Sequence, residues 1–182
     1  MDDLPQTLPA VCARALCGAD RDIFAERDAD GRWRKTRSHA VAERVEAIAS
    51  GLRAAGITSG DRVAIMSPNR VDWIVTNLAI VRAGGVTVPL YATQAHDQVR
   101  HILDDSGARL LFVDSAQTRA ALDAEHLVLP RTITFDGTGD GDDLAALEIA
   151  GRRAAMRAPA ALETIAERIA PDDLAMLIYT SG

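Results

Sequence analysis

The sequence has little cysteine and no long apolar run. The spacing of Cys12 and Cys17 matches neither a zinc knuckle nor a redox pair, so both are interpreted as free thiols in or near a helix. No apolar stretch approaches the roughly 20 residues of a membrane-spanning helix. The first residues, Met1-Asp2-Asp3, have neither the positive charge nor the apolar run of a secretory signal. We therefore expect a reducing, cytoplasmic location and no transmembrane segment.

Positive charge is also in deficit. The 26 acidic residues outnumber the 20 basic residues and give a formal net charge of −6, which argues against a dedicated nucleic-acid surface. Nucleotide binding stays open, because phosphates are usually held by local backbone amides and one or two cations. With 182 residues, 48% of them apolar, the chain is long enough for one domain or a little more with a real hydrophobic core.

Helical and strand-like patterns alternate through residues 38–135. The spacing of apolar residues predicts helices over residues 38–55, 71–82, 95–105 and 116–124. Short apolar runs predict strands at residues 62–66, 86–88, 110–113, 127–129 and 132–135. Because uniformly apolar strands are buried on both faces, the fold class is expected to be α/β, with a mainly parallel sheet flanked by helices.

Residues at the expected element ends favour these boundaries. Ser38 and Asn69 can cap the helices that follow them, and Gly56 can end the first helix. Pro89 is expected to close its strand, because proline cannot donate to a central ladder. Asp61-Arg62 is interpreted as a turn with a surface charge pair.

The loop at residues 136–143 is rich in glycine and aspartate. Gly137, Gly139 and Gly141 resemble a dinucleotide fingerprint, but the third glycine comes one residue early and the aspartates would repel a pyrophosphate. An EF-hand is excluded because Leu147 occupies the twelfth position, where a bidentate glutamate belongs. We interpret the segment as a solvated loop, followed by a helix-prone region.

The four histidines show no catalytic or metal-binding pattern. His96 and His101 are five residues apart and so do not stack on one helix face. All four are interpreted as surface or helix-end residues: His39, His96, His101 and His126.

The last residues form a different kind of pattern. An apolar run at residues 174–178, expected to be a buried strand, leads directly into Tyr179-Thr180-Ser181-Gly182. Phosphate-binding loops are built in this way, because small residues let backbone amides approach and hydroxyls donate to phosphate oxygens. Taken alone, four residues fit a frayed chain end better.

Several other stretches, taken in their order along the chain, favour the phosphate-binding loop over a frayed chain end. Residues 56–65 (GITSGDRVAI) and 83–91 (AGGVTVPLY) resemble G-[VI]-x-x-G-D-R-V-A-[IL] and A-G-[AG]-V-x-V-P-L-Y, two stretches of the adenylate-forming acyl-CoA synthetases, the AMP-binding family. The resemblance also includes Asn69, Trp73, Leu78-Ala79, residues 104–108 (DDSGA) and residues 171–175 (PDDLA) before the closing YTSG. It covers residues 30–182, and Trp33 and Ala92 are most similar to the long-chain fatty-acid branch.

The resemblance implies a fold, a reaction and a site. The chain would be an incomplete N-terminal part of the family's large domain: a lead-in at 1–37, an α/β core at 38–135, a loop and helix-prone region at 136–170, and a strand with the start of the phosphate loop at 171–182. Family members join a fatty acid to ATP as an acyl-adenylate, release pyrophosphate, and pass the acyl group to CoA with the help of Mg²⁺. Thr180, Ser181 and Gly182 would open the phosphate loop, which in the family continues Thr-Thr-Gly-x-Pro-Lys-Gly.

The family's loop lysine, adenine and ribose motifs and mobile C-terminal lobe have no counterpart in the sequence. We therefore expect a truncated synthetase that catalyses nothing alone, binds no cofactor tightly, has no catalytic residue or metal site to name, and can contact membranes only peripherally. A stand-alone α/β binding or interaction module derived from such an enzyme is the alternative. An independent flavodoxin-like nucleotide-binding protein would need a complete phosphate loop, which is not found.

Overall fold

The computed structural model describes residues 5–28, 30–137 and 141–180. Along this part of the chain the elements are α1 (Leu8–Leu16), β1 (Asp22–Arg27), β2 (Trp33–Arg37), α2 (Ser38–Ala54), β3 (Arg62–Met66), α3 (Val71–Arg82), β4 (Val86–Leu90), α4 (His96–Ser106), β5 (Leu110–Val113), α5 (Ala116–Ala124), β6 (Arg131–Thr134), α6 (Leu144–Arg157) and α7 (Ala161–Ala166).

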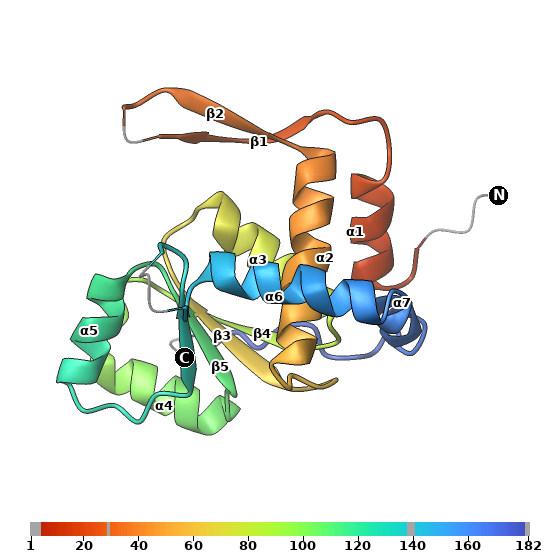
Figure 1. Cartoon of the computed structure of the whole chain (residues 1–182). Helices are drawn as coiled ribbons and strands as arrows, with labels where there is room; N and C mark the ends of the chain where they lie inside the picture. Colours follow the sequence, from red (N-terminus) through yellow and green to blue (C-terminus); the bar gives the residue numbers. More distant parts are fainter. Residues whose placement is uncertain (1–4, 29, 138–140, 181–182) are drawn as a thin grey trace.

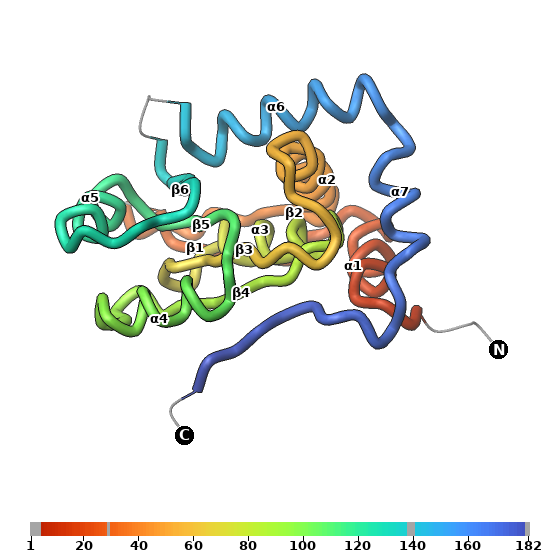
Figure 2. Tube along the Cα trace, turned by 90° about the horizontal axis from the view of Figure 1, so that it is seen from below, coloured from red at the N-terminus to blue at the C-terminus, as the bar shows by residue number. Residues whose placement is uncertain are grey.

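Four of the strands form a parallel sheet in the order β4-β3-β5-β6. Side chains alternate across the sheet, so each strand contributes to two cores. Val63 and Ile65 of β3 pack with α2, α3 and α6 on one face. Ala64 and Met66 pack with α4 and α5 on the other face. The predicted α/β class, with a parallel sheet covered by helices, is confirmed (Figures 1 and 2).

Glycine in the left-handed region ends the helices that precede β3, β4 and β5. Gly56 has φ +91° after α2, and Gly84 has φ +79° after α3. Gly107, with φ +60°, caps α4. These breaks return the chain to the same end of the sheet each time, so all four strands run in parallel.

The expected caps work differently. Ser38 begins α2, but its hydroxyl donates to Asp20 and accepts from the Arg21 amide rather than capping the helix. No side chain caps α3, and the Val71 amide instead donates to the carboxylate of Glu26 at 3.4 Å. Both helix starts are therefore held by polar groups of the N-terminal region, which the local sequence does not reveal.

The N-terminal region forms a hairpin that was not predicted. β1 and β2 pair antiparallel and project from the start of α2, away from the main sheet (Figure 1). Ile23 and Phe24 anchor the base of the hairpin against the core, while β2 is mostly exposed. Ion pairs cross the two strands, including Lys35 with Asp22 at 2.9 Å.

Two predicted strands are wrong. Residues 127–129 form no strand: Leu127 is buried but Val128 is 90% exposed, because β6 already occupies the edge beside β5. Residues 174–178 form a single bridge, between Met176 and Thr87, and Ile178 is 67% exposed. Figure 2 shows this final segment running along the outer side of β4.

Pro89 explains why the final segment pairs so little. β4 continues through Pro89 to Leu90, so the proline does not close the strand as expected. Thr87 turns its backbone outward, donating to the Ala175 carbonyl at 3.0 Å and accepting from the Leu177 amide at 2.9 Å. Two residues on, Pro89 faces the same way and has no N–H to donate to the next carbonyl. The ladder with β3 is unaffected, whereas the outer ladder stops.

The turn before β3 also differs from the interpretation as a surface charge pair. Asp61 accepts from the Thr58 amide at 2.6 Å and pairs with Arg109 at 2.8 Å, not with Arg62. Arg62 instead donates to the Ser106 carbonyl at 2.5 Å, which ties the end of α4 to β3. Among the described residues, no helix has the length and apolarity needed to cross a bilayer.

Candidate functional site

The carboxyl ends of the parallel strands meet at one edge of the molecule. β3 leads into residues 67–70, β4 into residues 91–95, and the final segment into Tyr179 and Thr180. Ligands of open α/β sheets bind outside the carboxyl ends of the strands. This edge is therefore where a ligand site is expected.

Two adjoining hollows lie at this edge. The first, of about 610 Å³, lies between the start of α4 and the final segment. Its lining residues are Tyr91, Thr93, Gln94, Gln98, His101, Ile102, Tyr179 and Thr180. The second, of about 490 Å³, shares Tyr91 and Tyr179 and extends under Ser67, Asn69 and Trp73. Both volumes lie in the range of small-molecule sites.

Tyr179 holds the final segment against α4. Its hydroxyl donates to the Asp105 carboxylate at 2.6 Å, and its ring meets His101 edge to face with 6.3 Å between ring centroids. The hydrogen bond to Asp105 is the main cause that raises the pKa of the Tyr179 phenol, followed by burial. The phenol therefore stays a hydrogen-bond donor across the physiological range, and Thr180 follows directly from this anchor.

The loop between β4 and α4 forms the opposite wall. The Gln94 amide donates to the Tyr91 carbonyl at 3.0 Å, which closes a turn. The Gln94 side chain then donates to Gln98 at 3.1 Å, in the first turn of α4. Thr93, Gln94 and Gln98 line the hollow, so this wall is polar.

The neighbouring position on the edge is occupied by a paired cation. Arg70, directly after β3, donates to Asp72 at 2.9 Å and to Asp136 at 3.0 Å, and its guanidinium lies 5.5 Å from the centroid of the Phe135 ring. Burial by itself would lower the pKa of Arg70, but the bonds to Asp136 and Asp72 outweigh it and raise that pKa. Arg70 thus bridges from β3 to the end of β6 and closes the edge over β5.

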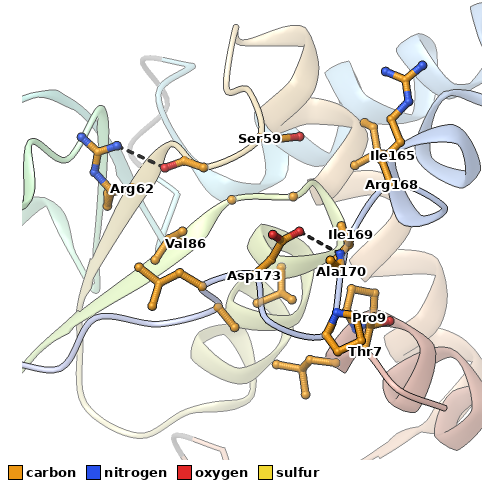
Figure 3. Close-up of a pocket in the computed structure, with 18 residues that line it drawn as sticks. Thr7, Pro9, Ser59, Arg62, Val86, Ile165, Arg168, Ile169, Ala170 and Asp173 are labelled. Atoms are coloured by element: carbon orange, nitrogen blue, oxygen red, sulfur yellow. Dashed lines mark hydrogen bonds between the residues drawn. The ribbon is translucent and has the colours of Figure 1, made fainter.

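A larger cavity, of about 800 Å³, lies at the opposite, amino-terminal edge of the sheet (Figure 3). Two of its polar side chains are engaged locally: Arg62 donates to the Gly60 carbonyl, and Asp173 accepts from the Ala170 amide. Size alone does not make this cavity the site, because the strand ends that position ligands in parallel sheets lie at the other edge.

The structure places Thr180 in the wall of the first hollow, where it is exposed. Ser181 and Gly182 lie outside the described residues, so the predicted phosphate-binding role of the three residues stays a prediction. Sequence reasoning missed the wall formed by Gln94 and Gln98, and it missed Asp105, which holds Tyr179. The spacing of His101 and Asp105, four residues apart on one helix, was the available signal for a shared helix face.

His101 is exposed and His96 is partly buried, with its Nδ1 3.5 Å from a Glu125 oxygen. The lining of the two hollows, as far as the structure describes it, contains no lysine or arginine. The one lysine of the sequence, Lys35, lies in the hairpin. No group of three metal-ligating side chains gathers within residues 5–28, 30–137 and 141–180. The described walls can therefore orient a ligand through hydroxyl and amide groups but do not balance the charge of a triphosphate.

These features define a class: an α/β domain with a parallel sheet, helices on both faces, and Tyr179 and Thr180 at the carboxyl edge of the sheet. Residues 17–182 match the family of AMP-binding enzymes, and the chain belongs to this family. The resemblance found in the sequence is thereby confirmed.

Relatives agree with the family assignment. The chain is 34% identical over 163 residues to the long-chain-fatty-acid–CoA ligase FadD15 of Mycobacterium tuberculosis, covering 88% of this chain and 26% of that protein. It is 35% identical over 145 residues to a feruloyl-CoA synthase of an Amycolatopsis species, covering 78% of this chain and 25% of that protein. The chain thus spans about a quarter of the length of these curated relatives.

Solved structures show the same fold. VinN superposes with a TM-score of 0.71 at 25% identity, covering 99% of this chain and 41% of that chain. A long-chain-fatty-acid–CoA ligase, FadD1 from Archaeoglobus fulgidus, superposes with a TM-score of 0.72 at 20% identity, covering 98% of this chain and 35% of that chain. The α/β architecture is therefore that of a part of the AMP-binding large domain.

Proposed function

We propose that these residues form the N-terminal part of the large domain of an ATP-dependent acyl-CoA synthetase. The whole enzyme would convert a fatty acid, ATP and CoA to acyl-CoA, AMP and pyrophosphate through an acyl-adenylate. The observation that carries the proposal is the position of Thr180, which leaves the sheet at its carboxyl edge and lines a hollow opposite the β4–α4 loop. The 34% identity to long-chain-fatty-acid–CoA ligases supports a long-chain fatty acid as substrate.

Within this proposal each end of the hollow has a role. The hydroxyls of Thr180 and Ser181 and the backbone of Gly182 would bind ATP phosphates, and Tyr179 would position them through its bond to Asp105. Thr93 and Gln98 would supply further hydrogen bonds from the opposite wall. The described residues offer no ligand set for Mg²⁺, so we assign the ion no protein ligand within this part of the chain.

We further propose that the 182 residues alone do not form an acyl-adenylate. Two observations support this: the chain spans about a quarter of its relatives, and the described walls of the hollows contain no cation. Charge development on transferring phosphates requires cations in the site. A stand-alone binding module is the second candidate, favoured by a sheet whose two faces are both closed by buried side chains.

Pyrophosphate exchange separates the two proposals. The purified chain, incubated with ATP, Mg²⁺ and long-chain fatty acids, should catalyse no carboxylate-dependent exchange above a protein-free control. A chimaera in which this chain replaces the matching quarter of a FadD15-type ligase should catalyse it, and Thr180→Ala in that chimaera should weaken ATP use. A folded but inactive chimaera would favour the binding module, and exchange by the chain alone would contradict the proposed inactivity.

A further inference from the structure

The helix α6 is apolar on two opposite faces. Leu144, Leu147 and Gly151 are buried against the body of the protein. On the opposite side, Ile149 is 53% exposed and Met156 is 74% exposed. At 100° per residue the two exposed side chains point in nearly the same direction, away from the buried stripe. Figure 2 shows α6 as the outermost element on its side of the sheet.

Three arginines border this outer apolar stripe. Arg152 lies along one side, and Arg153 and Arg157 lie along the other, by the same helical geometry. Arg152 pairs with Glu148 at 3.4 Å, whose carboxylate also accepts from Arg44 at 2.9 Å. Within the part of the chain that the structure describes, Arg153 and Arg157 have no ion-pair partner. A local positive face thus stands out on a chain whose formal net charge is −6.

We propose that the outer face of α6 rests on an anionic lipid surface. A helix that lies in a membrane interface presents apolar side chains to the headgroup–acyl boundary and cations to the headgroups. Ile149 and Met156 supply the apolar contacts, and the arginine stems lie along them while their guanidinium groups reach the phosphates. Two apolar side chains and three cations give weak, reversible binding rather than insertion.

Charge complementarity favours this occupant over a second copy of the chain. Copies pairing through this face would bring two sets of arginines together, which repel. The proposal goes beyond the synthetase function and does not depend on it. Lipid binding and adenylate formation can therefore fail separately.

The test is co-sedimentation of the 182-residue chain with vesicles. One set is phosphatidylcholine alone and the other contains equal parts of phosphatidylcholine and phosphatidylglycerol. Binding is expected only to the anionic set and should weaken as salt is added. Since each cation near such a surface changes affinity about fivefold, Arg153→Gln with Arg157→Gln should weaken binding about 25-fold.

Matched variants separate charge, apolar contact and folding. Arg14→Gln with Arg100→Gln removes the same charge from exposed positions on α1 and α4 and should change binding much less. Ile149→Glu with Met156→Glu should abolish binding, whereas Val128→Glu, at an exposed apolar residue elsewhere, should not. Arg153→Lys with Arg157→Lys should keep binding, because headgroups require charge rather than guanidinium geometry. Circular dichroism confirms that each variant is folded.

Three results would overturn the proposal. One is equal binding to both vesicle sets or to neither. Another is equal weakening by the α6 variants and by their matched controls. The third is concentration-dependent dimerisation of the chain that Ile149→Glu abolishes, which would assign the face to a second copy.

Discussion

The crossing of α2 with α6 and the final segment at residues 174–180 both border the same sheet, but they are packed very differently. At the crossing, the backbones of the two helices touch: a methyl group placed on Gly151 would lie 1.8 Å from the Ala47 carbonyl oxygen. Along the final segment, one bridge and a tyrosine hydrogen bond hold the chain, and Leu174 is 55% exposed.

The two regions differ in how many sides of the chain contact other elements. At the helix crossing, Gly51, Leu147 and Gly151 are buried where the two helices meet, so the facing sides of α2 and α6 close on each other. The final segment meets β4 on one side only, and Pro89 ends even that ladder. The closed region should respond to substitutions with large changes in the free energy of unfolding, and the open region with local changes.

The largest effect is expected at Gly151. In an exposed helix, alanine is favoured over glycine by about 1 kcal/mol. Here the added methyl group overlaps the Ala47 oxygen and lies 2.7 Å from the Gly51 nitrogen, so the helices must separate. Gly151→Ala should lower the free energy of unfolding by about 3 kcal/mol, measured by urea denaturation.

The control for this substitution lies one residue away. Ala150 is exposed on the same helix, so Ala150→Leu adds a larger side chain with little change in stability. If Gly151→Ala is as stable as the parent chain, the two backbones do not touch, and the contrast between the two regions disappears.

A smaller loss is expected at Asp61, which joins the turn before β3 to Arg109. Burial alone would raise the pKa of the Asp61 carboxyl, but hydrogen bonds from Thr58 and the contact with Arg109 outweigh it and lower the pKa below 3.8. Because the pKa of Asp61 is lower in the folded state, its ionised carboxylate stabilises the fold at pH values above the ordinary pKa of an aspartate. Asp61→Asn should therefore cost about 1–2 kcal/mol at neutral pH.

This loss should depend on pH in one direction. As the pH falls through the lowered pKa of Asp61, the carboxylate becomes protonated. The free energies of unfolding of the parent chain and of Asp61→Asn should then converge. Asp104→Asn, at an exposed position on α4, is the control and should change the free energy of unfolding much less at neutral pH. If the difference in the free energy of unfolding between the parent chain and Asp61→Asn is the same at all pH values, the ionised carboxylate is not the source of the stabilisation.

Much of the α/β core was predictable because its patterns are local. The expected helix at residues 71–82 and the expected strand at residues 110–113 match α3 and β5. Apolar spacing and glycine breaks specify such elements without knowledge of their neighbours. The hairpin was missed because β2 is polar and exposed, so it has no apolar alternation to detect.

The wrong strands and the missed site have a common cause. An apolar run becomes a strand only when a partner strand is free, and residues 127–129 and 174–178 have no full partner in the described chain. Likewise, Gln98 and Asp105 meet the final segment because β4 lies at the edge of the sheet, a property of strand order. The apolar run followed by small residues suggested Thr180 as a site residue, but four residues alone fit a frayed chain end better, and the family resemblance decided between the two.

A gain in stability is expected where the two regions meet. Thr87 is fully buried in β4, and its hydroxyl has no hydrogen-bond partner among the described residues. Replacing an unpaired buried hydroxyl by a methyl group removes a desolvation cost. Thr87→Val should therefore raise the free energy of unfolding by about 1 kcal/mol, because its backbone bonds to the final segment remain.

The matched control has the opposite sign. Thr132 in β6 is also buried, but its hydroxyl donates to the Pro130 carbonyl at 2.9 Å. Thr132→Val should lower stability by about 1 kcal/mol. Equal destabilisation by both substitutions would mean that the Thr87 hydroxyl forms a hydrogen bond in solution, which would contradict the prediction.

The smallest global effect is expected at Tyr179. Tyr179→Phe removes the hydrogen bond to Asp105 but keeps the ring beside His101, so the free energy of unfolding should change by only about 0.5 kcal/mol. The local effect should be larger. The Leu177 amide, bonded to the Thr87 carbonyl, should exchange its hydrogen several-fold faster, because the final segment loses one of its two attachments.

The pH dependence of the same amide tests the cause. Because the pKa of Tyr179 is raised above 10.0 in the folded chain, the hydrogen bond stabilises the neutral phenol fully below that value and is lost as the pH rises through the raised pKa. The parent and Tyr179→Phe chains should therefore differ in Leu177 protection at neutral pH and converge only in strong alkali. Tyr91→Phe, at a residue 76% exposed in the same hollow, should leave Leu177 unchanged. Equal exchange in the parent and Tyr179→Phe chains at neutral pH would mean that the bridge at Thr87 alone holds the segment, and that Tyr179 does not position Thr180.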